Sequence, residues 1–175
     1  MIFATTGTHP QPMERLVVWL DEWAEECQEE VVVQMMHTQA TPKHLTLVTC
    51  VTPQRWRELV QGARVVISHA GPASLFEIQG LGKTPVVVPR SASFDEHVDD
   101  HQERYAKTLG PDVPVVWTRH ALRDRLVEPP APCLVPDRSQ LQREASAAVE
   151  GCTARAVSTA SIGVLGRTLR TCFWR

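Results

Sequence analysis

Short apolar runs alternate with longer amphipathic stretches along the first 120 residues of the chain. The apolar runs are rich in β-branched residues, as is typical of parallel strands buried on both faces, and they span residues 2–6, 31–34, 45–48, 65–68, 85–88 and, more weakly, 113–117. The intervening stretches predict helices over residues 12–29, 53–62, 74–81 and 100–109. This alternation predicts βαβ units and therefore an α/β fold, a Rossmann-like parallel sheet with helices on both faces.

The helix expected over residues 12–29 has the clearest pattern. Pro12 stands at its start, where the missing N–H of proline has no partner to lose. Apolar residues then recur at helical spacing and predict one buried stripe, made of Met13, Leu16, Val17, Leu20, Trp23, Ala24 and Cys27.

A cluster of prolines at positions 129, 130, 132 and 136 marks a break in the pattern. We expect one domain over residues 1–128 and a separate tail over residues 129–175. Residues 139–149 predict a further helix. Residues 151–175 contain four arginines and no acidic residue. They are interpreted either as a frayed tail or as a segment that docks on a partner or an anionic membrane surface.

Composition excludes several classes of protein. The formal net charge of −2 over 175 residues gives no electrostatic reason to expect nucleic acid as a partner. No run approaches the roughly 18 apolar residues of a membrane span, and the N-terminus lacks the basic start of a signal peptide. We therefore expect a cytoplasmic protein with no span of its own. The five cysteines are widely spaced and never form a CxxC pair, which argues against disulfides and a zinc site.

Two small-residue turns follow predicted strands, and ligands of open parallel sheets bind beyond the carboxyl ends of strands. The turn TTGTH, residues 5–9, contains Gly7, which allows backbone to approach a phosphate closely. The segment SHAGPASLFE, residues 68–77, leads through Gly71 into a helix whose first N–H groups suit an anion. Together the two turns predict a diphosphate site.

Two residues of the second segment have competing interpretations. Ser74 and Glu77 have the spacing of a capping box, in which the glutamate bonds the helix's own first amide. Glu77 could equally bind the hydroxyls of a ribose. His69 is interpreted either as a packed loop histidine or as part of the binding site.

A third polar segment, DEHVDDHQ at residues 95–102, lies beyond the strand expected at residues 85–88. Side chains of this kind at a helix start suit the recognition of sugar hydroxyls. The alternatives are a solvated acidic helix start and a metal site made of His97, Asp99 and His101. The metal interpretation is the weakest, because no third histidine stands at a recognised spacing.

The three segments together resemble the C-terminal domain of glycosyltransferase family 28, and most closely its split-subunit branch, whose members act on dolichol-linked or exopolysaccharide acceptors. The resemblance covers residues 1 to about 109. It implies the donor-binding half of a GT-B glycosyltransferase. It further implies that Glu77 binds ribose, that the diphosphate and the donor sugar each have a set of contacts, and that His69 belongs to the same site. The diphosphate residues would be Gly7, Thr8, Gly71, Ala73 and Ser74, and the sugar residues His101 and Gln102.

The resemblance also implies the chemistry. The reaction would be inverting and independent of metal and cofactor, with a UDP-sugar as donor. The resemblance implies that a membrane-associated partner subunit supplies the acceptor site and the general base. No residue of this chain stands out as that base, and His9 is only a candidate. Two alternatives stay open, namely a non-enzymatic nucleotide-sugar-binding module and a metal-dependent hydrolase.

Overall fold

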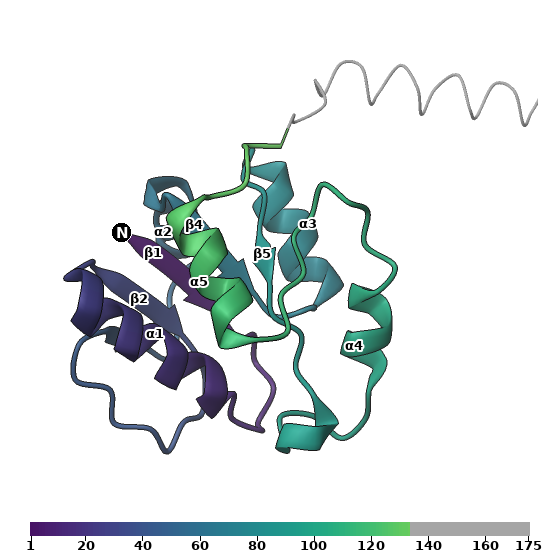
Figure 1. The fold of residues 1–175 in the computed structure, drawn as a ribbon, viewed down its shortest axis with the longest axis horizontal. Coiled ribbons are helices and arrows are strands. Elements are labelled where there is room, and N and C mark those ends of the chain that lie inside the picture. The colour runs from purple at the N-terminus through teal and green to yellow at the C-terminus, as the bar shows by residue number, and fades with distance from the viewer. Residues whose placement is uncertain (134–175) are drawn as a thin grey trace, which may run out of the picture. The chain divides into compact units, whose positions relative to one another are not determined.

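The computed structural model describes residues 1–133, which form one α/β unit (Figure 1). Five parallel strands form one sheet in the order β3-β2-β1-β4-β5. The strands are β1 (Ile2–Thr5), β2 (Val31–Gln34), β3 (Thr46–Val48), β4 (Val65–Ser68) and β5 (Val86–Val87). The helices are α1 (Glu14–Cys27), α2 (Pro53–Gly62), α3 (Pro72–Gly80), α4 (His101–Ala106) and α5 (Arg119–Val127), with a short 3₁₀ turn η1 (Ala92–Phe94) before α4. The predicted parallel sheet with flanking helices is confirmed.

Successive residues of β1 point to opposite faces of the sheet, as the pleat requires. Ile2 and Ala4 join a buried cluster with the apolar residues of α1 and α5, whereas Phe3 packs with α2 and α3 on the other face. Because both faces are covered, the strands can be apolar throughout, which explains their continuous valine and isoleucine runs.

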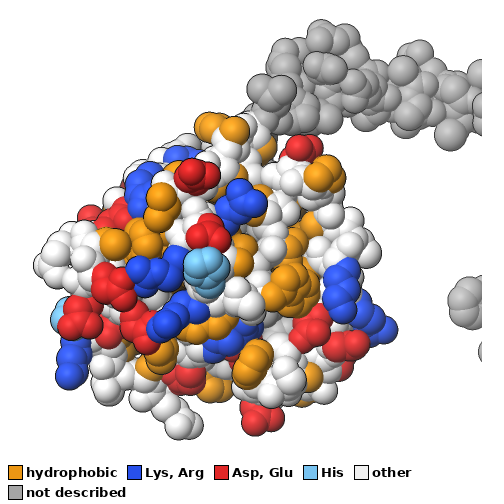
Figure 2. Space-filling view, viewed as in Figure 1, with side chains coloured by type: hydrophobic (Ala, Val, Ile, Leu, Met, Phe, Trp, Pro, Cys, Tyr) orange, Lys and Arg blue, Asp and Glu red, His pale blue; other side chains and the backbone are white. Residues whose placement is uncertain are grey.

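Helices α1 and α5 lie side by side on one face and are joined by two ion pairs (Figure 1). Arg119 pairs with Glu22, and Arg123 pairs with Glu26. On this face basic and acidic side chains are interspersed (Figure 2). No patch of a single sign is visible on this face (Figure 2).

Several element predictions need correction. The sequence did not predict α5, because only Leu122 and Leu126 of this polar helix are buried. The strand expected at residues 113–117 is reduced to a single bridge between Val115 and Val87. Cys27 is exposed at the end of α1 rather than buried in its apolar stripe. The helix and tail expected beyond residue 133 lie outside the described residues.

Candidate functional site

The site lies where the chain order of the strands reverses. From β1 the chain moves outward through β2 and β3, then returns to place β4 on the other side of β1. The loops that follow β1 and β4 therefore start from neighbouring carboxyl ends of the sheet and run apart. In open parallel sheets, ligands bind at this point. These loops are the two small-residue turns, containing Gly7 and Gly71.

His69 joins the two turns. This residue is 8% exposed, and its Nδ1 lies 3.4 Å from the carbonyl oxygen of Thr5. A Cβ added at Gly7 would lie 2.6 Å from the ring, and one added at Gly71 would lie 2.2 Å from its Nε2. Both glycines therefore contact the imidazole closely, and Gly7 in addition has a φ of 73°, a backbone conformation that favours glycine. The ring occupies the space that side chains would otherwise need.

Burial keeps His69 neutral. Loss of hydration lowers the pKa of His69 to about 4, and the nearby positive charge of Arg90 acts in the same direction. A carbonyl oxygen can only accept, so Nδ1 carries the proton. At neutral pH His69 is thus an uncharged packing group between the two turns.

An open pocket of about 450 Å³ lies beside these turns. It is lined by residues of the β1 and β2 ends, of α2 and of α3, namely Thr5, Gly7, Thr8, Gln34, Val51, Pro53, Trp56, Arg57, Ser74 and Glu77. Four of the nine residues assigned to the site from sequence are among them, namely Gly7, Thr8, Ser74 and Glu77. A second pocket of about 440 Å³, beside Leu109 and Trp117, contains none of the nine.

The capping-box interpretation of Ser74 and Glu77 is wrong. Helix α3 begins at Pro72 with Gly71 as its N-cap, and no side chain caps it. Ser74 is therefore already inside the first turn. The carboxylate of Glu77 instead lies 3.7 Å from the guanidinium of Arg57 across the pocket, with both side chains about half exposed.

The remaining residues of the second turn surround the start of α3. Gly71 has an extended backbone, and Ala73 is exposed in the first turn of the helix. The first N–H groups of a helix have no partner within it. Here Pro72 has no N–H at all, so the amides of Ala73 and Ser74 are the donors that this helix end can offer to an anion.

The third segment places a second polar cluster at the same end of β1. The ring of His9, in the loop after β1, stacks on His97 at a centroid distance of 4.3 Å, and His97 meets His101 edge to face at 4.4 Å. Burial lowers the pKa of both His9 and His97, with neighbouring imidazoles adding to the shift. No local pattern in the sequence indicates that His9 approaches this segment.

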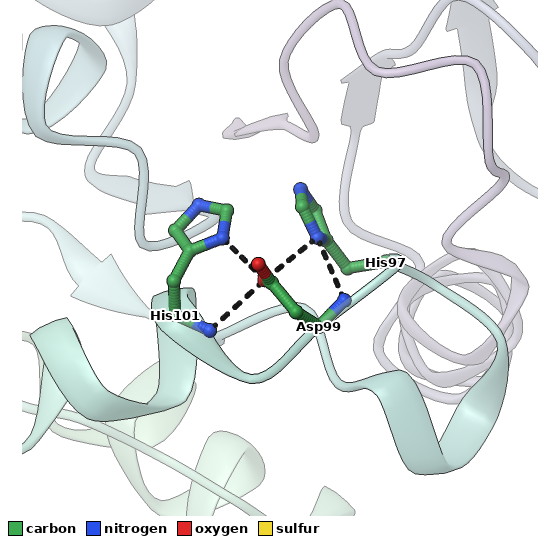
Figure 3. Close-up of side chains that lie close together, drawn as sticks. All are labelled: His97, Asp99 and His101. Carbon is green, nitrogen blue, oxygen red and sulfur yellow. Dashed lines mark hydrogen bonds and ion pairs between the residues drawn. The ribbon is translucent and has the colours of Figure 1, made fainter.

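Asp99 lies between His97 and His101 (Figure 3). Its Oδ1 is 2.5 Å from Nδ1 of His101 and 3.3 Å from Nδ1 of His97, and it accepts the backbone N–H of His101 at 3.1 Å. These atoms lie within 4.8 Å of one another, so they could in principle surround a cation. The carboxylate oxygen is already engaged by two N–H donors, however.

A family model described as the glycosyltransferase family 28 C-terminal domain matches residues 1–128. The chain belongs to this glycosyltransferase family. The family 28 domain also resembles the NMR solution structure of ALG13, with a TM-score of 0.51 over 79% of this chain and 91% of that one. The sequence identity is 17%, so this likeness concerns the fold. No curated protein matches the sequence. None of the helices described within residues 1–133 combines the length and the apolar composition of a membrane span.

Sequence reasoning missed the residue that ties the loops together. Arg90 is 1% exposed, and its guanidinium donates to the backbone carbonyls of Thr6, Gln11 and Glu96. Its own backbone N–H lies 3.4 Å from Oε1 of Gln102, the buried member of the expected sugar-binding pair. Thr6 and Gln11 belong to the loop after β1, and Glu96 belongs to the loop between β5 and α4. Arg90 therefore fixes these two loops to each other.

Glu96 strengthens the same junction. Its carboxylate, 2% exposed, forms a bidentate pair with Arg15 of α1, at 2.9 and 2.8 Å, and also accepts the backbone N–H of Ser91. Arg15 further donates to the carbonyl of Pro89. Arg90 follows β5 as a single arginine, and its partners are backbone groups. The sequence around Arg90 therefore carries no signal for such a network.

Proposed function

We propose that this family 28 domain is the donor-binding, catalytic subunit of an inverting glycosyltransferase. It takes a UDP-sugar as donor and a lipid-linked glycan as acceptor, and it acts together with a membrane-associated partner subunit. One observation supports this above all. Gly7 and Thr8 of the first turn and Ser74 and Glu77 of α3 line one pocket at the point where the strand order reverses, where open parallel sheets bind nucleotides.

Each part of a UDP-sugar has a matching element. The amides of Ala73 and Ser74 and the positive end of the α3 dipole suit the diphosphate, and Arg57 adds a full charge beside them. The carboxylate of Glu77, half exposed at the rim, suits the two ribose hydroxyls. His101 and Gln102 are the first two residues of α4, and we assign to them the donor sugar, which follows the diphosphate.

The general base is expected from the partner. The nitrogen Nδ1 of His9 accepts the backbone N–H of Gln11 at 3.3 Å, which places the proton of the neutral ring on Nε2. His9 then has no free lone pair for an acceptor hydroxyl and is a poor candidate. With the base and acceptor site on the partner, the domain would be cytoplasmic and held at the membrane through that subunit.

Calorimetry with UDP and UDP-sugars, with and without magnesium, tests the proposal. We expect binding that does not depend on magnesium. Glu77→Gln should weaken UDP binding by about 1–3 kcal/mol, roughly 5- to 150-fold, because hydrogen bonds to a charged group are lost. The exposed ion pair between Glu77 and Arg57 contributes little to stability, so the melting temperature of Glu77→Gln should not change. Glu58→Gln, at an exposed carboxylate of α2, is the matched control.

Unchanged UDP affinity in Glu77→Gln would refute the ribose assignment, and binding that requires magnesium would favour the hydrolase alternative. Co-purification then identifies the partner. Sugar transfer on addition of that partner separates an enzyme subunit from a non-enzymatic nucleotide-sugar-binding module, which would bind UDP and transfer nothing.

A further inference from the structure

The hydrogen bond between Asp99 and His101 fixes which nitrogen of His101 can accept. Nδ1 lies 2.5 Å from Oδ1 of Asp99 (Figure 3). An ionised carboxylate can only accept, so in the neutral ring Nδ1 carries the proton and Nε2 keeps its lone pair. The backbone N–H of His101 donates to the same oxygen, so Asp99 holds both the backbone and the ring of His101 in place.

The charge of Asp99 is maintained by the same contacts. The hydrogen bond from the His101 backbone, followed by the one from its ring, lowers the pKa of Asp99. The carboxylate is therefore ionised at neutral pH, as the acceptor role requires. The His101 ring is about half exposed, and Nε2 stands on the side of the ring away from Asp99 (Figure 3). A ligand can reach that nitrogen.

We propose that Asp99 is a positioning residue that presents His101 Nε2 as a hydrogen-bond acceptor for one hydroxyl of the transferred sugar. This inference rests on the proposed function. A sugar hydroxyl that donates to Nε2 keeps its lone pairs free for other donors. A donor sugar that lacks this hydroxyl leaves Nε2 unpaired, so the pair selects for a hydroxyl at that position.

The surroundings favour a sugar over a cation at these atoms. Oδ1 of Asp99 already holds two N–H donors, and a metal ion would displace both. The positive charge of Arg90 also acts on this region, since it contributes to the lowered pKa of His97. A second cation would be repelled, whereas a neutral hydroxyl would not.

The test measures the increment in affinity that the sugar adds to UDP. Dissociation constants for UDP, UDP-glucose, UDP-galactose and UDP-N-acetylglucosamine are first measured by calorimetry. The UDP-sugar that binds most tightly is then used with the variants. Asp99→Ala should leave the UDP constant within about twofold and weaken the UDP-sugar roughly 3- to 10-fold, the contribution of one hydrogen bond. Asp100→Asn is the control, since this neighbouring carboxylate pairs with Arg104 on the surface.

Two further measurements exclude a merely structural role. The ¹⁵N NMR spectrum of the His101 ring should show the proton on Nδ1 in the wild type and a shift toward the Nε2–H tautomer in Asp99→Ala. His101→Gln supplies an acceptor oxygen that needs no tautomer to be set. In that background Asp99→Ala should no longer affect the sugar increment.

The outcomes separate the two proposals. If the wild type binds no UDP, the proposed function fails and this inference with it. If UDP binds but the sugar adds no affinity, or if Asp99→Ala leaves the increment unchanged, only the inference is overturned. Equal weakening of UDP and UDP-sugar in Asp99→Ala would also overturn it, because the residue would then act on the whole pocket.

Discussion

A methyl group added at Gly71 tests how the two turns pack against His69. The backbone of Gly71, with φ −82° and ψ 117°, is open to any L-residue, so Gly71→Ala introduces no backbone strain. The new Cβ would lie 2.2 Å from Nε2 and 2.9 Å from Cδ2 of His69, whereas unstrained contacts are about 3.5–4.0 Å. The ring would have to move by more than an ångström.

The ring has little room to move. Gly7 contacts it on another side, and its Nδ1 lies within reach of the Thr5 carbonyl. Overpacking of this kind costs about 1–3 kcal/mol. Two smaller effects of Gly71→Ala nearly offset each other, because alanine restricts the unfolded chain but is a poorer N-cap than glycine. We therefore expect Gly71→Ala to lower the free energy of unfolding by about 1–3 kcal/mol, almost wholly through His69.

Urea unfolding of a double-mutant cycle isolates the contact. In the His69→Ala background the imidazole is gone, and Gly71→Ala should change the free energy of unfolding by no more than about 0.5 kcal/mol. Gly80→Ala, at a glycine of α3 with nothing within 4 Å of its added Cβ, should be neutral or stabilising in both backgrounds. Gly7→Ala should stay destabilising by about 1–2 kcal/mol even without the ring, because its positive φ remains.

The reasoning is refuted if Gly71→Ala is neutral or stabilising in the wild type. It is also refuted if the cost of Gly71→Ala is the same with and without the imidazole. Either result would mean that the two turns do not meet at His69.

Three further outcomes follow from charges and buried polar groups. The pKa of His69 is lowered to about 4, so the unfolded state takes up this proton before the folded state does as the pH falls. The stability of the wild type relative to His69→Asn, measured by urea titration, should therefore decline by up to roughly 3 kcal/mol between about pH 6.5 and 4. The pKa of Glu29 is lowered to about 2 by its hydrogen bonds with Arg64, so the stability advantage over Glu29→Gln should be complete above about pH 4.5 and fade as the pH falls toward 2; an advantage independent of pH would contradict this. Arg90→Met leaves three backbone carbonyls without their donor and should lower the free energy of unfolding by on the order of 3–5 kcal/mol. The control Arg55→Met, at an exposed ion pair, should lower it by less than about 1 kcal/mol. Equal losses of stability in the two variants would show that the buried network is not stabilising.

Much of the fold could be predicted from local sequence. The helix at residues 53–62 and the strand at residues 65–68 agree with α2 and β4 residue by residue. The reason is that their signals are local: a proline after the Thr52 cap starts the helix, and a run of β-branched residues makes the strand. Where such signals were weak, as in the polar α5 and the marginal strand before it, prediction failed.

The capping-box error shows the limit of spacing. Ser74 and Glu77 have the right separation, but Pro72 starts the helix two residues earlier. Once the helix begins there, Glu77 lies a full turn inside it, and its nearest opposite charge comes from α2. Spacing along the chain cannot tell which residue of a helix stands first.

The sequence by itself determined the alternation of strands and helices and the two glycine turns that follow strands. Only the tertiary structure decided that β4 lies next to β1, and this adjacency brings Gly7 and Gly71 onto the same imidazole. It also decided that Arg90 binds the carbonyls of the first loop and that His9 stacks on His97. Such contacts join residues 84 and 88 positions apart in the chain, many of them through backbone atoms that every residue possesses. They depend on how the sheet is ordered and packed, so no local pattern of side chains encodes them.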